Sequence, residues 1–405
     1  MLTDRSSLRV CMVLLTIFAC SVTVSAQSNA SSDSLGRQRD IVDAIQRAFK
    51  PGSPIRSGEN NKKLTQISVA PAFGYTLQTG LAGIITGNAL IQSSKYPSQN
   101  ISAINSYLAY TQYNQLLFNT ESTIWTDNNK YNLIGDWRLL RYPSENYGLG
   151  STTSINDHFT INYNYLRLHE AVLRNIGRNW YAGLGYQFDY HWGISESGVD
   201  TNKGATDFDR YGFRKNSISS GITLNLLQDT RTNPVNPRGG WYGKLVVRNN
   251  FTWLGSNSNW QSLLIDARKY IPVNHGKQVL ALWSYNWFTL HGNPPYLDMP
   301  SLGWDTYNNT GRGYIQSRFQ GKNMLYDEAE YRFNITANGL LGAVLFTNMH
   351  SFSQWPGGSF EKLNVGYGGG LRIKLNKFSN TNIAIDYGLG FQGSRGLFVN
   401  LGEVF

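Results

Sequence analysis

The sequence predicts an all-β chain that folds as a 16-stranded antiparallel transmembrane β-barrel. Beyond residue 26 there is no run of 18 apolar residues, so a transmembrane helix is not expected. From about residue 64 onward, apolar and polar residues alternate with period two between short turn-like segments. The 24 Tyr, 19 Phe, 11 Trp and 41 Gly, with only 15% charged residues, suit aromatic girdles and close-packed strands. Without a transmembrane helix, only a closed barrel gives every backbone N–H and C=O group in the lipid a hydrogen-bond partner.

Residues 1–26 predict an export signal, because Arg5 and Arg9 precede an apolar stretch that ends in small residues. Both cysteines, Cys11 and Cys20, lie inside this segment, so the mature chain is expected to contain none. A lipoprotein attached through Cys20 is the alternative, which the bulky residue two positions earlier disfavours.

Residues 27–64 are predicted to be a short periplasmic segment with a helix at about 40–49. Ile41, Ile45 and Phe49 recur at a spacing of four and form one apolar stripe. We expect the helix to pack on the periplasmic rim of the barrel, and a plug inside the lumen is the alternative. The segment is too short for a folded periplasmic domain.

Residues 65–405 form the predicted barrel. In residues 383–391, for example, large apolar side chains alternate with Ala, Asp and Gly, which suits one lipid face and one crowded polar lumen. An even strand number puts both chain ends on one side, predicted to be the periplasm, with the long loops outside. The predicted strands begin near Ile67, Leu81, Ile101, Leu116, Tyr131, Phe159, Trp180, Ser217, Trp241, Trp260, Val279, Leu325, Leu341, Leu363, Ile383 and Leu397.

The last strand carries Leu397, Val399, Leu401 and Phe405 at period two, and no later segment can cover this apolar face. It resembles the closing strand of bacterial outer-membrane barrels, with its terminal aromatic residue. Leu401 and Phe405 are therefore the expected assembly signal for the barrel assembly machinery, with outer-membrane lipids covering the strand. Glu403 lies on the same register and is expected at the membrane interface.

A turn before a middle strand contains two prolines and adjacent glycines, which argue for a fixed conformation on physical grounds. It has the acidic-x-Arg, Pro and Gly pattern typical of one outer-membrane family. The residues that match this pattern are Asp229, Arg231, Pro237 and Gly240.

The longest loop, the sixth on the extracellular side, contains Gly311, Arg312, Gly313 and Tyr314. Together with the turn pattern, this motif resembles the BamA/TamA-like superfamily of outer-membrane insertases and two-partner secretion transporters, also called the bacterial surface antigen family. In that superfamily a matching Arg-Gly-aromatic tip folds back into the lumen. The resemblance therefore implies an inward-folded sixth loop.

The strand that follows this loop has Glu328, Glu330 and Arg332 on its lumen face, and it matches the Glu-x-Arg-Phe strand of the family. The next strand departs from the family pattern: after Phe346, an amide at Asn348 replaces the usual carboxylate. Because charge-assisted hydrogen bonds are the stronger ones, the Arg of the loop motif is expected to contact Glu330 or Glu328.

The resemblance implies insertion or translocation of polypeptide, or lipid, at the outer membrane. The first strand would pair imperfectly with the last, so that a client strand could add to the open edge. The periplasmic polypeptide-binding modules of family insertases are missing, so client polypeptides would require a separate periplasmic partner. A passive pore or structural barrel is the main alternative.

Enzymatic activity is not expected. The six histidines are scattered without metal-ligand spacing, and there is no Gly-x-Ser-x-Gly elbow, so no catalytic residue, metal or cofactor is predicted. The glycine run at 366–370 lies in an alternating strand and favours close strand packing over a phosphate loop. A barrel-embedded lipid hydrolase or acyltransferase stays open. The net charge of +10 comes without a basic cluster, which argues against nucleic acid as a partner.

Overall fold

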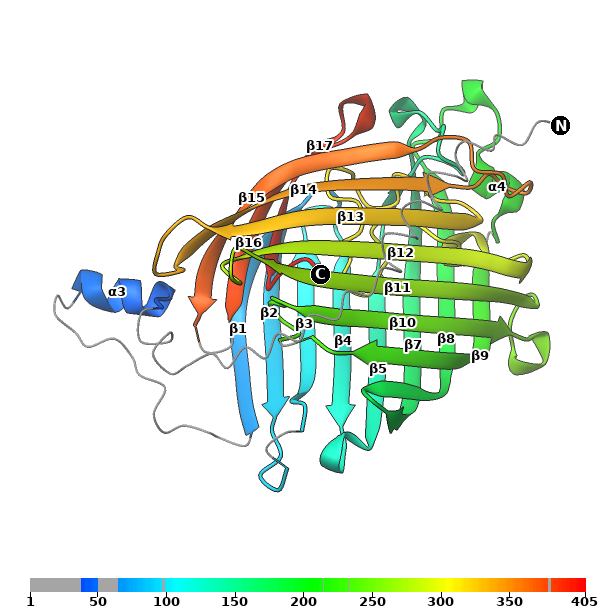
Figure 1. Ribbon diagram of the computed structural model, residues 1–405. Helices are drawn as coiled ribbons and strands as arrows, with labels where there is room; N and C mark the ends of the chain where they lie inside the picture. Colours follow the sequence, from blue (N-terminus) through cyan, green and yellow to red (C-terminus); the bar gives the residue numbers. More distant parts are fainter. Residues whose placement is uncertain (1–37, 50–64, 97–98, 214, 232, 378–379) are drawn as a thin grey trace. The chain divides into compact units, whose positions relative to one another are not determined.

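The structure is a computed structural model that shows one antiparallel sheet curved into a nearly closed barrel (Figure 1). The predicted signal segment lies outside the described residues, as does most of the segment that follows it. The structure describes residues 38–49, 65–96, 99–213, 215–231, 233–377 and 380–405.

The wall consists of strands joined in chain order, each antiparallel to the next. Two described α-helices, α3 (Ile41–Phe49) and α4 (Asp207–Tyr211), are not part of the wall. The strands are β1 (Thr65–Thr76), β2 (Gly80–Ile91), β3 (Ser102–Thr111), β4 (Leu116–Trp125), β5 (Tyr131–Arg141), β6 (Ser144–Asn146), β7 (Phe159–Gly177), β8 (Trp180–Ser197), β9 (Asn216–Asp229), β10 (Gly240–Asn250), β11 (Trp260–Val273), β12 (Gln278–Gly292), β13 (Asn323–Asn334), β14 (Leu341–Phe352), β15 (Asn364–Asn376), β16 (Thr381–Leu389) and β17 (Arg395–Leu401).

The predicted barrel fold is confirmed, with one strand more than the predicted 16. The extra strand, β6, is a three-residue piece that pairs with β7 just beyond the residues of β7 that pair with β5. β5 and β6 therefore share one position in the wall. Each of the 16 predicted strand starts lies within two residues of an observed start.

The two faces of the wall differ as period-two alternation requires. On β13, Tyr326, Glu328 and Glu330 point inward and are fully or almost fully buried. Apolar side chains on the outer face stay exposed, such as Leu184 at 61% and Leu345 at 60%. An outer surface of this kind matches a lipid environment, while the inner face carries charged and amide groups.

The connection between β12 and β13, residues 293–322, folds into the barrel; we call it loop 6. Leu302, Tyr314 and Phe319 of this loop are buried against wall side chains that include Trp283 and Tyr326. Burial of this apolar surface stabilises the docked loop.

The C-terminal strand departs from its prediction. β17 ends at Leu401, and Gly402 has φ of 94°, a left-handed value that turns the chain out of the sheet. Glu403 and Phe405 lie inside the barrel, only 4% of Phe405 is exposed, and Leu401 remains outside at 63%. The expectation that Phe405 shares the lipid face of Leu401, with Glu403 at the membrane interface, is therefore wrong. We call residues 402–405 the C-terminal tail.

Helix α3 contacts two turns at the end of the barrel where the short connections lie. The Lys377 ammonium donates to Asp43 at 2.8 Å, and the Arg39 backbone N–H donates to the Asn338 carbonyl at 3.1 Å. On the predicted apolar stripe, Ile45 and Phe49 are exposed. Across the described residues, no helix combines the length and the hydropathy that crossing a bilayer demands.

The two ends of the strand series, β1 and β17, lie next to each other. β1 pairs with β2 along its length, and β17 pairs with β16. Within the described part of the chain, no hydrogen-bonded ladder joins β1 to β17. We call the line between these two strands the seam.

Candidate functional site

The tip of loop 6 is shaped by two glycines on either side of Arg312. Gly311 and Gly313 have φ of 88° and 105°, which L side chains rarely adopt. A Cβ at Gly311 would lie 2.4 Å from Leu302 Cγ, and one at Gly313 would lie 2.7 Å from the Leu389 carbonyl oxygen. The tip therefore requires glycine at both positions, and this backbone carries the side chain of Arg312 into the lumen.

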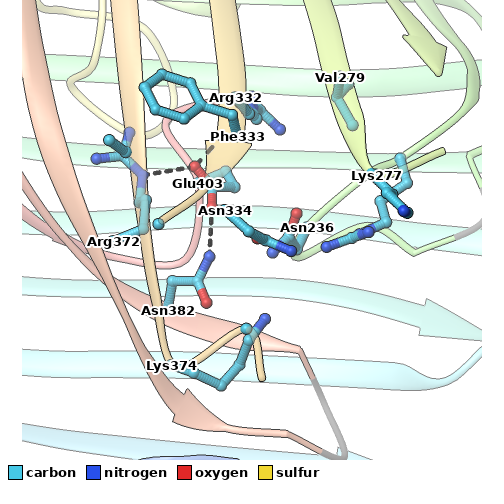
Figure 2. A pocket seen from close by; sticks show the side chains of 14 residues that line it. Asn236, Lys277, Val279, Arg332, Phe333, Asn334, Arg372, Lys374, Asn382 and Glu403 are labelled. Atoms are coloured by element: carbon cyan, nitrogen blue, oxygen red, sulfur yellow. Dashed lines mark hydrogen bonds and ion pairs between the residues drawn. The ribbon is translucent and has the colours of Figure 1, made fainter. Parts of the chain in front are cut away.

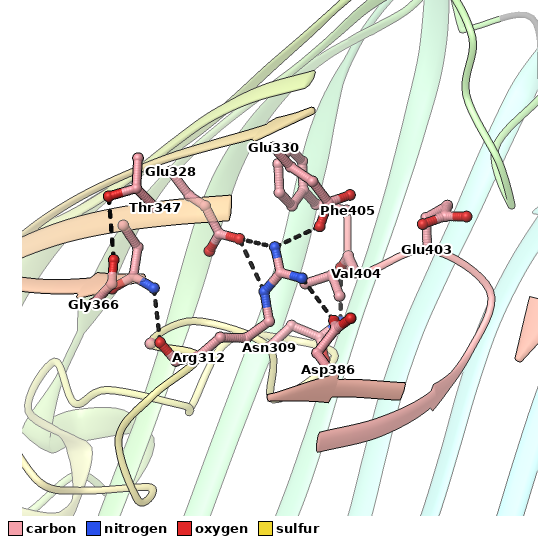
Figure 3. Close-up of polar contacts among 12 residues, drawn as sticks. Asn309, Arg312, Glu328, Glu330, Thr347, Gly366, Asp386, Glu403, Val404 and Phe405 are labelled. Carbon is pink, nitrogen blue, oxygen red and sulfur yellow. Dashed lines mark hydrogen bonds and ion pairs between the residues drawn. The ribbon is translucent and has the colours of Figure 1, made fainter. Parts of the chain in front are cut away.

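The Arg312 guanidinium lies among three carboxylates from two wall strands (Figure 3). Its Nε donates to Glu328 Oε1 at 3.0 Å, Nη2 lies 2.6 Å from Glu330 Oε2, and Nη1 donates to Asp386 Oδ2 at 2.7 Å. All four side chains are at most 1% exposed. The motif and strand β13 led to Glu328 and Glu330 from the sequence, whereas Asp386 on β16 was placed on the lumen face without a partner.

The residues of β14 complete the enclosure of Arg312. The ring of Phe346 lies 3.8 Å from the guanidinium carbon, a cation–π contact. The Asn348 amide donates to the Arg312 backbone carbonyl at 2.9 Å. An ionised carboxylate at position 348 could not donate this hydrogen bond, so Asn348 binds the loop backbone rather than the guanidinium. The third carboxylate on Arg312 comes from Asp386 instead.

Tyrosines hold the loop tip to the wall. The Tyr314 hydroxyl donates to the Val365 carbonyl at 2.7 Å and accepts from the Phe391 backbone N–H at 2.8 Å. The Gly311 N–H donates to the Tyr326 hydroxyl at 3.0 Å. These bonds satisfy buried polar groups that would otherwise oppose docking of the loop.

The ion cluster continues toward the C-terminal tail through Arg332 and Arg372. Arg332 Nε lies 2.6 Å from Glu330 Oε1, and Arg372 Nε donates to Glu403 Oε2 at 2.7 Å. Arg372 also contacts Asp386. Three arginines and four carboxylates thus link loop 6, three wall strands and the tail in one buried network.

The tail is fixed by aromatic packing and by main-chain hydrogen bonds. The ring of Phe405 lies 5.1 Å from that of Trp283, and Arg332 Nη2 donates to the Phe405 carbonyl oxygen at 2.8 Å. Asn309 of loop 6 donates to the Val404 carbonyl at 2.7 Å. Loop 6 and the tail therefore support each other inside the lumen.

A second anchor of loop 6, on the β5 wall, was not found from the sequence. Arg138 pairs with Asp136 at 2.8 Å and donates to the Thr306 carbonyl at 2.9 Å. Loop residue Arg318 donates to the Thr153 carbonyl at 2.7 Å. No motif marks either arginine: alternation along β5 was the only available signal for Arg138, and Arg318 lies within loop 6, where strand alternation gives none.

The turn motif forms a separate local structure between β9 and β10. Arg231 pairs with Asp229 at 2.8 Å and lies over the ring of Tyr242 at 4.5 Å. Gly240 has φ of 101°, and a Cβ there would lie 2.3 Å from the Thr230 carbonyl oxygen. Pro237 is buried in the same turn. These contacts fix the turn itself, and one further hydrogen bond, from the Glu403 N–H to the Val235 carbonyl at 3.2 Å, joins the turn to the C-terminal tail.

Comparison with solved structures gives the same fold at low sequence identity. BamA from Haemophilus ducreyi lacking POTRA domains 1–3 has a TM-score of 0.56 and 12% identity, over 93% of this chain and 82% of that one. CdiB from Acinetobacter baumannii has a TM-score of 0.54 and 13% identity, over 84% and 60%. CdiB from Escherichia coli has a TM-score of 0.53 and 11% identity, over 88% and 73%.

A search of curated protein sequences finds no match. The model of the Omp85 superfamily domain, however, matches residues 98–396, which is most of the barrel together with loop 6. The matched region includes the loop motif and the strands that enclose Arg312. This chain belongs to the Omp85 superfamily.

Proposed function

We propose that this Omp85 barrel inserts or translocates polypeptide at the outer membrane through the seam between β1 and β17. The observation that carries the proposal is the mismatch of the two edges: β17 has 7 residues, β1 has 12, and the tail turns away from β1. An unpaired strand edge is a template for strand addition. Membership of the superfamily and the likeness to BamA and CdiB barrels support the same role.

The proposed orientation places the short turns and both chain ends in the periplasm, where clients arrive. Clients would be captured by a separate periplasmic partner protein or directly at the seam. The barrel assembly machinery would act on the C-terminal strand of this chain during its own assembly, and outer-membrane lipids would cover the outer face. We propose no enzymatic role.

Site-specific photo-cross-linking tests the seam. A benzophenone amino acid at Val69 on β1 or Leu401 on β17, both exposed beside the seam, is expected to cross-link to client polypeptides in cells. The matched control is Leu224 on β9, which is also exposed but lies between two fully paired neighbours. Equal labelling at all three sites would contradict passage through the seam.

A passive pore or structural barrel is the competing function. Such a barrel would give a steady current in planar bilayers and no client cross-links at the seam. The buried loop 6 network opposes free passage through the lumen, because Arg312, Tyr314 and Phe319 occupy it. A lipid client remains within the proposal, since lipid could cross the same edge.

A further inference from the structure

A pocket lies on the inner wall at the short-turn end of the barrel (Figure 2). About 440 Å³ of space free of protein atoms lies between its lining residues, and part of that space is open to solvent. Its charged lining comes from the β9–β10 and β11–β12 turns, from β13 and β15, and from the tail. We call it the basic pocket; its charged residues are Arg238, Lys277, Arg332, Arg372, Lys374 and Glu403.

The basic pocket carries more positive charge than its single carboxylate can balance. Glu403 accepts from Arg372 at 2.7 Å and from the Asn382 amide at 2.6 Å. Arg238, Lys277 and Lys374 form no ion pair within the ranges that the structure describes. Three cations without an ion pair therefore line one cavity: Lys374 is buried, whereas Arg238 and Lys277 are exposed at its rim, and Arg238 donates to the Gly276 carbonyl at 3.1 Å.

A buried donor in the same cavity also has no partner. Arg332 is 7% exposed, and its Nε and Nη2 are taken by Glu330 and by the Phe405 carbonyl. Its Nη1 is buried and, within the described residues, makes no hydrogen bond. Buried N–H groups in folded proteins are almost always satisfied, so a free nitrogen on a guanidinium that lines the basic pocket indicates an acceptor that the described residues do not supply.

We propose that the basic pocket binds a phosphate group. The donors belong to separate elements: Lys374 extends from β15, Lys277 from the opposite turn, and Arg332 from the wall between them (Figure 2). Donors that arrive from several directions match the tetrahedral oxygens of phosphate. A planar carboxylate is best held by one guanidinium fork, whereas the two buried donors here come from different side chains, Lys374 and Arg332. The phosphate source is either free inorganic phosphate or the headgroup of a phospholipid.

Calorimetric titration of the full chain in non-ionic detergent tests this site. The probes are inorganic phosphate and a water-soluble short-chain phosphatidic acid. Saturable binding is expected, and Lys374→Gln should weaken it about tenfold or more, because a charge-assisted hydrogen bond is lost. Glu403→Gln should tighten phosphate binding, because it removes the carboxylate that lines the pocket and repels an anion there. Unfolding of the barrel would weaken binding in both variants. Weaker binding in Lys374→Gln together with tighter binding in Glu403→Gln therefore indicates a specific site.

Lys95→Gln is the matched control, since Lys95 is an exposed lysine outside the pocket and its loss should change nothing. Heat-modifiable migration on gels verifies that each variant barrel is folded. Tighter binding of phosphatidic acid than of phosphate assigns the headgroup as the source, and equal binding assigns free phosphate. Absence of saturable binding, binding unaffected by Lys374→Gln, or binding of an aspartate-rich peptide but not of phosphate would overturn the proposal.

Discussion

At the scale of single residues, Arg312 is the residue that joins loop 6 to the buried ion cluster of the lumen. Its guanidinium is shared by Glu328, Glu330 and Asp386, and all of these side chains are buried. Removing one arginine from such a cluster is costly, because it leaves buried carboxylates without a counter-charge. The motif in the sequence was sufficient to predict Arg312 and its contact with β13. The third carboxylate could not be predicted, because strand alternation places Asp386 on the lumen face without showing which loop reaches it.

Replacing Arg312 by Ala is expected to destabilise the barrel by about 3–5 kcal/mol, since three buried carboxylates lose a partner and Glu328 loses its arginine. Urea unfolding in detergent, followed by tryptophan fluorescence, measures this change in the free energy of unfolding. Arg210→Ala is the control, because the Arg210 side chain is 54% exposed and its pair with Asp207 is worth at most about 1 kcal/mol. Equal losses in the two variants would contradict the central role of Arg312.

Phe405 packs inside the lumen, so its truncation should act as a core mutation. Phe405→Ala is expected to cost about 3–5 kcal/mol of stability, because the contacts with Trp283 and Tyr270 are lost. The exposed Phe391 provides the control, and Phe391→Ala should change stability little. The temperature of heat modification on gels gives the comparison. An unchanged temperature for the Phe405 variant would place its ring outside the packed interior.

At the scale of elements, period-two alternation was sufficient to place the strands. It failed where one backbone torsion changes the direction of the chain. The left-handed φ at Gly402 turns the tail inward, and the ion pair of Glu403 with Arg372 holds it there. Glu403 and Arg372 lie far apart in sequence, so the local pattern of the last strand could not show their pairing. That pattern also gives no backbone torsion for Gly402.

Docking of loop 6 is expected to strengthen as the pH falls. The pKa of Asp298 is raised to about 7: burial and then the nearby Asp189 raise it, while Arg248 and the hydrogen bond from Ser219 oppose the rise. His191 Nδ1 lies 3.8 Å away. A carboxyl with a raised pKa favours its neutral form in the docked loop. Docking therefore weakens as pH rises from the ordinary value of 3.8 to about 7, and is constant above that.

Protease cleavage of loop 6 at pH 5 and pH 8 measures this dependence. The wild-type loop should be cut faster at pH 8 after correction for the pH profile of the protease. Asp298→Asn cannot ionise and should show no difference between the two conditions. A wild-type loop that is cut more readily at pH 5 would reverse the sign and refute the assignment.

Helix α3 contacts turn residues, so removal of residues 27–60 is expected to change channel conductance little. The apolar stripe of the helix also fits poorly against a polar lumen. Single-channel recording in planar bilayers measures the effect. Deletion of residues 306–316, which include the buried tip residues 310–314 of loop 6, should raise the conductance and serves as the comparison. A large rise after the N-terminal deletion would instead identify α3 as a plug.

At the scale of the whole molecule, the buried network and the seam lie on connected elements. Arg312 of loop 6 and Arg372 of β15 both contact Asp386 of β16. Arg372 also contacts Glu403 of the tail, and the tail continues directly from the seam strand β17. The state of the seam is therefore tied to the ion pairs of the lumen. A client strand that pairs with β1 would have to displace only the short edge of β17, because the tail has already left the sheet.

Depletion of this protein in its own cell, with the abundance of outer-membrane proteins measured over time, tests the central claim most directly. If the barrel inserts or translocates polypeptide, a defined set of outer-membrane or surface proteins should fall before growth slows. Re-expression of the wild-type chain should restore them. Unchanged levels of every outer-membrane protein after full depletion, together with a steady current from the purified barrel, would contradict the proposed function and favour a passive pore.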